Sequence, residues 1–285
     1  MPAGEIVIRP LELPEEYHRA ESVQRQAWNM HDVEIVPSHL LITAAKNGGL
    51  VLGAFEREQL VGMLLGFLGQ GASGRYKHCS HMMGVIPSHR GRGIATALKA
   101  SQRKFALAQG LDLITWTYDP LESVNAALNI ARLGATSRTY LRNIYGDMRD
   151  ALNQGLTTDR LQVDWWIRSS RVIDSIEKSR KLPTLSSLSN AGGRVVNRTR
   201  TGKQGLLEPI DWTRVDASAV LIEIPSHFQE IKSKDMALAR VWRQMVREIF
   251  EYYVDRDYQI TEFLSENAAD SRQCLYVLEK SKDIG

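Results

Sequence analysis

The sequence predicts an α/β protein of the α+β kind, in which helices flank a mixed sheet. Short apolar runs rich in β-branched residues alternate with segments of helical spacing, from Glu5 to about residue 170. A glycine-rich basic turn joins one of these strands to a helix near Gly91. A second, shorter β-α-β-β pattern follows a polar stretch. These observations favour a helix-covered sheet in the first part of the chain and an added half-domain after it.

The length of 285 residues exceeds that of most single domains, so we expect two domains or one domain with a large extension. The patterns place a first domain at residues 1–170, a linker or irregular segment at 171–205 and a C-terminal half-domain at 206–285. The net charge is only +3, from 36 basic and 33 acidic residues. That balance does not indicate nucleic-acid binding.

The first 170 residues are expected to contain elements in the order β-α-α-β-β-β-α-β-α-β-β. Prolines mark helix starts, and glycines such as Gly110 and Gly134 mark helix ends. The expected strands are Glu5–Leu11, Leu50–Phe55, Leu60–Leu68, Arg75–Ile86, Leu111–Tyr118, Thr139–Tyr145 and Leu161–Ile167. The expected helices are Glu15–Trp28, a segment from Pro37 to Asn47 with Leu40, Leu41, Ala44 and Ala45 facing inward, Gly93–Ala108 and Glu122–Leu133.

The C-terminal part begins with a stretch, Arg180–Gly205, that reads as a solvated linker or capping loop. Four basic residues in this stretch could instead bind nucleic acid, as in a nucleic-acid-binding regulator, an interpretation that we favour less. These residues are Arg194, Arg198, Arg200 and Lys203. A helix over Asp235–Asp255 has a wide apolar face, which the first domain or a second subunit must cover. A homodimer therefore remains open. The accompanying strands are expected at Ala219–Ile224, Tyr258–Leu264 and Gln273–Leu278.

Neither a membrane segment nor a metal site is expected. No apolar run approaches the length of a membrane span, and the first residues lack the pattern of a signal peptide. The two cysteines, Cys79 and Cys274, have no metal-ligand spacing. A reduced, cytoplasmic setting is the simplest interpretation.

The stretch Gly84–Leu98 reads as a strand end, a glycine-rich turn and the start of a helix. Glycines allow close backbone approach, and a helix start favours an anion, so the geometry predicts a phosphate site. A nucleotide P-loop is excluded because its Lys-Ser/Thr pair is missing. A dinucleotide-binding motif is excluded because Thr96 occupies the position of its third glycine. The turn matches the pattern Arg/Gln-x-x-Gly-x-Gly/Ala as Arg90-x-x-Gly93-x-Ala95.

This motif, with the element order over Glu5–Ser169, resembles the GNAT superfamily of acyl-CoA-dependent N-acyltransferases. The resemblance implies a GNAT fold, with acyl-CoA bound between the splayed fourth and fifth strands, and a degenerate GNAT-like half-domain at the C-terminus. It implies that Asn125 lies close to the coenzyme, although a role as a first-turn helix cap is equally open. The pantetheine arm is expected at Gly84, Val85 and Ile86, and the phosphates at Arg90, Gly91, Arg92, Gly93, Ile94 and Ala95.

Many family members protonate the leaving thiolate with a tyrosine on the fourth helix, but Ile130 stands at that position here. The replacement candidates are Asp119, Tyr145 and His81. Asp119 precedes a proline and is equally open as a helix cap. Tyr145 is also open as a packing residue. His81 and His78 fall on opposite faces of their strand, so one of them should face solvent or the cleft, and a lone histidine is more often packed than catalytic.

The segment Thr115–Leu121, the run Asn125–Ala135, the turn Asn143–Gly146 and the C-terminal half resemble a GNAT branch linked to N-succinylamino-acid racemases. Some members of that branch are thought to succinylate amino acids. We therefore expect an enzyme that moves an acetyl or other short acyl group, succinyl included, from acyl-CoA to a primary amine of a small molecule such as an amino acid. The alternative is a non-catalytic acyl-CoA-binding sensor or scaffold, which the missing helix tyrosine would suit.

Overall fold

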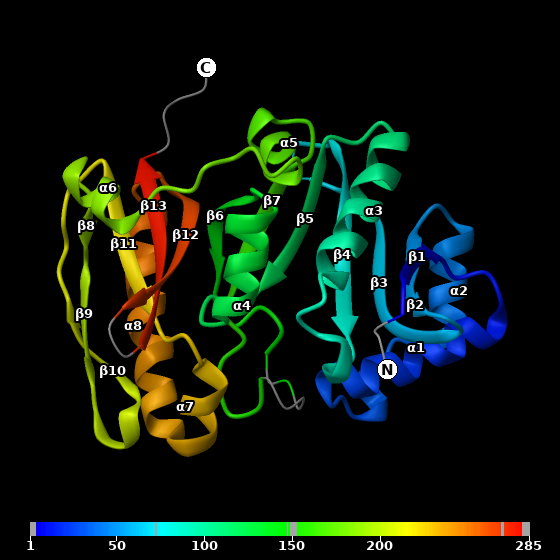
Figure 1. The fold of residues 1–285 in the computed structure, drawn as a ribbon, viewed down its shortest axis with the longest axis horizontal. Helices are drawn as coiled ribbons and strands as arrows, with labels where there is room; N and C mark the ends of the chain where they lie inside the picture. Colours follow the sequence, from blue (N-terminus) through cyan, green and yellow to red (C-terminus); the bar gives the residue numbers. More distant parts are fainter. Residues whose placement is uncertain (1–3, 72, 147, 149–152, 269–270, 281–285) are drawn as a thin grey trace. The chain divides into compact units, whose positions relative to one another are not determined.

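The computed structural model describes residues 4–71, 73–146, 148, 153–268 and 271–280. The chain separates into two compact units. The first unit lies within Met1–Trp116, Arg149–Gln154 and Trp166–Arg168, and the second within Thr117–Met148, Gly155–Trp165 and Ser169–Gly285. Figure 1 shows the elements of each. The domain limits expected from the sequence stay a prediction.

The first unit is built on a sheet with the strand order β1-β2-β3-β4-β5. Neighbouring strands from β1 to β4 are antiparallel, and β4 and β5 are parallel. Helices α1 and α2 pack on each other, and α3 packs against β1 to β4. The strands are β1 (Ile6–Pro10), β2 (Leu50–Glu56), β3 (Gln59–Gln70), β4 (Tyr76–Val85) and the start of β5 (Leu113–Tyr118). The helices are α1 (Pro14–Trp28), α2 (Ser38–Lys46) and α3 (Ile94–Ala108).

The core of this unit forms because β2 and the first part of β3, from Leu60 to Gly66, carry apolar residues on both faces and are almost fully buried. On α3, residues at helical spacing such as Ile94 and Leu98 turn the same way into that core.

One expectation for α2 is wrong. Leu40 is 50% exposed, whereas Leu41 is fully buried, because only one side of this short helix meets the sheet.

The second unit contains a sheet in the order β7-β6-β12-β13-β11-β8 and a separate hairpin of β9 and β10. Its strands are β6 (Thr136–Leu141), β7 (Arg160–Trp166, apart from its last residue), β8 (Arg194–Val195), β9 (Asn197–Thr201), β10 (Leu207–Trp212), β11 (Ala219–Ile224), β12 (Tyr258–Ala268) and β13 (Ser271–Lys280). Its helices are α4 (Ser123–Ala126), continued by a π-helical turn over Ala127–Arg132, α5 (Ser170–Ile176), α6 (Leu185–Asn190), α7 (Phe228–Lys234) and α8 (Met236–Val254).

Several elements of the second unit differ from expectation. The strand expected at Thr139–Tyr145 lies earlier, as β6, and the residues after Leu141 form a turn. The stretch expected as linker holds α6, β8 and β9, which are too short to leave a clear periodicity. The fourth helix switches to π geometry after Ala126, and Leu133 N–H donates to Leu128 O.

The apolar face of α8 is covered by strands of its own unit. Trp242, Val246 and Phe250 are fully buried, and α8 packs on β6, β10 and β12. Of the two coverings left open, the first domain supplies part, because β6 lies within residues 1–170, and β10 and β12 of the C-terminal part supply more. A second subunit is not needed for this purpose, and a homodimer stays a prediction. Within the part of the chain that the structure describes, no helix is both long and apolar enough to cross a membrane.

Candidate active site

A tight turn links the end of β4 to the start of α3 in the first unit (Figure 1). Gly91 and Gly93 both adopt φ +78°, a conformation that residues with a Cβ rarely adopt. A Cβ built on either glycine would meet no atom within 4 Å. Gly93 immediately precedes α3 and provides no side-chain cap. The turn therefore combines open space with a helix start whose first N–H groups can receive an anion.

Arg90 donates to main-chain groups of its own unit. Its Nη2 lies 2.6 Å from Ala27 O at the end of α1, and its Nε lies 3.2 Å from Val85 O at the end of β4. The side chain is exposed and has further N–H donors. Arg90 therefore holds the turn against α1 and β4, a positioning role that the motif did not predict.

Arg92 is paired with an acidic residue at the end of β2. Its Nη2 donates to Glu56 Oε1 at 2.7 Å and to Gly4 O at 3.2 Å. His89 also hydrogen-bonds Glu56, across 2.9 Å from its Nε2. The hydrogen bonds from Arg92 and then His89 lower the pKa of Glu56 to about 2. This carboxylate partly neutralises the turn, so the backbone N–H groups contribute a larger share of its attraction for phosphate than the two arginines alone suggest.

The end of β4 is closely packed. A Cβ on Gly84 would lie 2.6 Å from Cη2 of Trp28 in α1, so glycine is required here for packing. Ile86 is buried and donates its N–H to Val61 O in β3. Val85 is half-buried. Contacts of Gly84, Val85 and Ile86 with a pantetheine arm stay a prediction, as do those of Ile94 and Ala95 with phosphate.

His81 occupies a bulge in β4. The pairing with β3 shifts between Met82 and Ser80, which leaves His81 as the extra residue. Its side chain is exposed, and its ring lies 5.9 Å from that of Phe67. Neighbouring atoms nevertheless desolvate the ring and lower its pKa. At neutral pH the imidazole is therefore held in its neutral form, which can accept a proton.

His78, on the opposite face of β4, is fully buried, and neither ring nitrogen has a hydrogen-bond partner among the described residues. Its ring packs edge-on against Phe105 of α3. Burial, and then the nearby Lys99, lower its pKa to about 4. The expectation that one of the two histidines packs and the other faces outward is confirmed.

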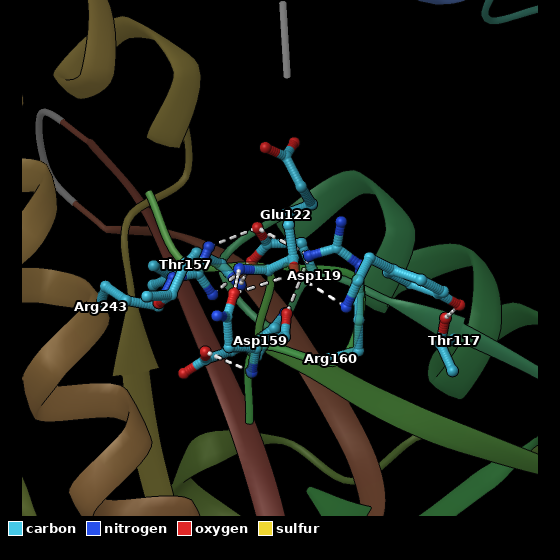
Figure 2. A network of polar contacts seen from close by, with 12 residues as sticks. Thr117, Asp119, Glu122, Thr157, Asp159, Arg160 and Arg243 are labelled. Atoms are coloured by element: carbon cyan, nitrogen blue, oxygen red, sulfur yellow. Dashed lines mark hydrogen bonds and ion pairs between the residues drawn. The ribbon is translucent and has the colours of Figure 1, made fainter. Parts of the chain in front are cut away.

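The second unit holds a network of ion pairs around Asp119 and Asp159 (Figure 2). Arg243 of α8 donates to both oxygens of Asp119, with 3.0 Å between Nη1 and Oδ1. Arg160 approaches the same carboxylate at 3.7 Å. Asp119 Oδ1 also accepts the N–H of Leu121 at 2.9 Å, as expected for a turn-capping residue. Asp119 is thus a hydrogen-bond acceptor in this network, and its catalytic role stays a prediction.

Asp159 is fully buried beside Arg247, which donates through Nε at 2.7 Å and through Nη2 at 2.9 Å. The hydroxyl of Tyr140 and the N–H of Asn143 donate to the same carboxylate. Burial alone would raise the pKa of Asp159, but these hydrogen bonds together hold it below its ordinary value. The carboxylate is therefore a satisfied, structural anion.

Tyr145 lies in the turn after β6 and is 52% exposed. Its hydroxyl is 2.8 Å from Thr117 Oγ1, and the guanidinium carbon of Arg160 is 5.6 Å from its ring centre. Arg160 therefore connects Tyr145 with Asp119, and the structure brings these two predicted residues into one neighbourhood. Asn125 is exposed in the same unit. Its relation to the glycine turn stays a prediction.

The network contains residues that the sequence did not reveal. Arg243 and Arg247 lie four residues apart on α8, within the face that otherwise reads as apolar. Two arginines inside such a face are the one signal that could have indicated buried ion pairs, because uncompensated charge is not kept in a core.

Two of the four basic residues considered for nucleic acid are neutralised by acidic partners. Arg198 pairs with Asp211, and Arg200 pairs with Glu208 across the β9–β10 hairpin. Arg194 is exposed on β8, and the side chain of Lys203 lies outside the described residues. This pairing disfavours a phosphate-binding surface on the hairpin.

Residues 10–135 match the family model described as Acetyltransferase (GNAT) family. No match is found among the curated proteins. The chain is similar to the solved ribosomal-protein-S18-alanine N-acetyltransferase from Escherichia coli, at 14% identity and a TM-score of 0.44 over 58% of this chain and 96% of that one. It is similar to Arabidopsis thaliana NAA60 in complex with a bisubstrate analogue, at 16% identity and a TM-score of 0.47 over 57% of this chain and 98% of that one. It is also similar to an N-acetyltransferase from Staphylococcus aureus Mu50, at 15% identity and a TM-score of 0.44 over 58% of this chain and 100% of that one.

The family match covers β2 to β5, α1 to α3 and the glycine turn, and it continues through the fourth helix. The segment from residue 10 to residue 135 is therefore similar to the GNAT acetyltransferase family and has a GNAT-like fold, and further strands follow it toward the C-terminus.

Proposed function

We propose that this protein is an acyl-CoA-dependent N-acyltransferase that moves an acetyl or other short acyl group to the primary amine of a small molecule. The observation that carries the proposal is the turn between β4 and α3, where Gly91 and Gly93 leave open space before an uncapped helix. A pyrophosphate fits that position because the helix start favours anions. The family match over residues 10–135 supports the same activity. Bound there, acyl-CoA would supply the acyl group as a thioester.

Acyl transfer requires an uncharged amine, because an ammonium ion has no lone pair to attack the thioester carbonyl. The C–N bond then forms, the C–S bond breaks and the thiolate takes up a proton. We propose that His81 accepts the proton of the incoming ammonium, since its lowered pKa favours the neutral ring. Tyr145, which is 52% exposed, is our proposed donor to the thiolate. Asp119 is the alternative, and it would have to leave Arg243 and take up a proton first.

The donor that we propose is acetyl-CoA or another short acyl-CoA, succinyl-CoA included. The acceptor that we propose is a small-molecule amine, with amino acids as the first class to test.

The test of the coenzyme site is Gly93→Val, measured by calorimetric titration with CoA. Valine at φ +78° strains the backbone and places methyl groups in the open space, so CoA binding should be lost. Gly48→Val is a matched control, because Gly48 has a similar φ of +82° and equally open space, with no atom within 4 Å of where a Cβ would lie, but follows α2. A folded Gly93→Val protein that binds CoA as the wild type does would contradict the proposal.

Ile130 favours a second candidate function, a non-catalytic acyl-CoA sensor. It is fully buried at the position where many family members carry the acidic tyrosine. Release of free thiol from acetyl-CoA or succinyl-CoA in the presence of an amino-acid pool separates the two candidates. Turnover that falls about 10²-fold in His81→Gln or Tyr145→Phe supports the enzyme. Tight CoA binding without turnover in the wild type supports the sensor instead.

A further inference from the structure

A lysine lies where the pairing of β4 with β5 ends. The parallel ladder runs as far as Cys79 and Thr115, and the next residues along the two strands are Ser80 and Trp116. Lys99 reaches this point from α3. Its Nζ donates to Ser80 Oγ at 2.9 Å and lies 3.5 Å from the ring centre of Trp116. The side chain therefore spans both strands just beyond their last paired residues, and all five residues belong to the first unit.

Lys99 fills space that is closed to solvent, because only 2% of it is exposed. Its other hydrogen bond goes to Gln102 Oε1, at 3.1 Å. All the groups that contact the amine in these interactions are neutral, and no ion pair to Lys99 occurs among the described residues. Burial lowers the pKa of the amine well below its ordinary value. A buried lysine without an ionic partner costs stability, so packing alone is a poor reason for it.

Lys99 belongs to the same helix that begins at the glycine turn. Strand β4 runs between the two places, and its stretch from Ser80 to Val85 spans about 17 Å. That length is comparable to an extended pantetheine arm. A coenzyme with its phosphates at Gly93 and its arm along β4 would direct its acyl group toward the bulge at His81 and then toward Lys99.

We propose that Lys99 limits the length of the acyl group, by filling the place where the pairing of β4 with β5 ends. This inference rests on the proposed function. With the lysine in place, an acetyl group fits in front of Ser80 and Trp116, and a longer chain meets the lysine stem. Alanine at this position leaves the volume of four side-chain atoms open for additional methylene groups.

The experiment compares the affinities of the full-length protein for free CoA, acetyl-CoA and hexanoyl-CoA by calorimetry. The variants are Lys99→Ala, which removes the stem, and Lys99→Met, which keeps an unbranched chain of similar length without the charge. Lys104→Ala on the same helix is the control, since Lys104 is exposed. The wild type should prefer acetyl-CoA to hexanoyl-CoA, and Lys99→Ala should reduce that ratio by about 10-fold or more. Lys99→Met and Lys104→Ala should keep the wild-type ratio.

The outcomes separate this inference from the function on which it rests. A wild type that binds no CoA overturns both. A wild type that binds CoA, with an unchanged acyl ratio in a cooperatively folding Lys99→Ala variant, overturns the role of Lys99 alone. If Lys99→Ala does not fold, Lys99→Val takes its place, because it fills part of the vacated space and is still much shorter than lysine, and an unchanged ratio in that variant overturns the role equally.

Discussion

The two units of the chain bury polar side chains in different ways. In the first unit, Lys99 contacts only neutral groups, and His78 has no hydrogen-bond partner among the described residues. In the second unit, the buried carboxylate of Asp159 accepts hydrogen bonds from Arg247 and two further groups, and Asp119 pairs with Arg243. The first unit leaves these two buried bases without an opposite charge, whereas the second unit pairs these two acids with arginines.

The difference indicates different reasons for burial. A paired network compensates most of its own desolvation, so it can persist for structural reasons alone. A buried polar group without a partner lowers the stability of the fold. Proteins keep such groups mainly where a function needs the side chain. Lys99 and His78 lie on the strand and helix that carry the glycine turn, which agrees with that view.

The comparison is tested most strongly by breaking the paired network. Arg247→Met leaves the fully buried Asp159 without its guanidinium, so we expect a loss of about 3–5 kcal/mol in the free energy of unfolding. Urea denaturation at pH 7 measures this loss. A change below about 1 kcal/mol would show that Tyr140 and Asn143 satisfy the carboxylate by themselves.

Acid should reveal the unpaired histidine. The folded pKa of His78 is about 4 and its ordinary value is 6.5, so the unfolded chain binds a proton first as the pH falls. Stability of the wild type should therefore decline between pH 6.5 and about 4, by up to roughly 3 kcal/mol. His78→Leu should remove this decline, whereas the exposed His18→Leu should keep it.

This acid window is distinct from that of the paired network. The pKa of Asp159 is lowered from an ordinary value of 3.8, so the stability that it contributes is present above that pH and disappears only below it. A His78→Leu variant with the wild-type profile between pH 6.5 and 4 would assign the decline to other groups.

Lys99 should have a smaller effect, in the same pH direction but in a more alkaline range. The ordinary pKa of lysine is 10.5, and burial lowers that of Lys99, so below pH 10.5 the unfolded chain is favoured by protonation. Lys99→Met should raise stability at pH 7 by about 1 kcal/mol, with the gain shrinking as the pH approaches 10.5. Thermal unfolding at pH 7 and pH 10 measures the difference. A gain that does not depend on pH would show that the lysine is charged in the fold.

The smallest effect is expected at an exposed ion pair of the second unit. Arg142 donates to both oxygens of Glu251, but the arginine side chain is 59% exposed. Solvent screens such pairs, so Arg142→Met should leave the urea midpoint unchanged within error. If Arg142→Met lowered the free energy of unfolding as much as Arg247→Met does, burial would not explain the difference between the Arg142–Glu251 and Arg247–Asp159 pairs.

Local features of the fold could be predicted from the sequence. The conformations of Gly91 and Gly93 follow from residues within the turn itself, and α8 follows from its period of apolar residues. The long-range pairs could not be predicted in this way. Arg243 and Asp119 are 124 residues apart, and nothing near either residue specifies its partner. Lys99 reads as one polar residue of a helix until its contacts with Ser80 and Trp116 are known.

The pairing of β6 with β12 has a consequence for the order in which the chain folds as it is synthesised. Ser137 pairs with Ile260, so the segment around β6 acquires this neighbour only after more than a hundred further residues have left the ribosome. The strands β1 to β4 and helix α3 find their partners much sooner. Nascent chains halted before Tyr258 should therefore carry a protected first unit beside a protease-sensitive segment from Thr117 onward.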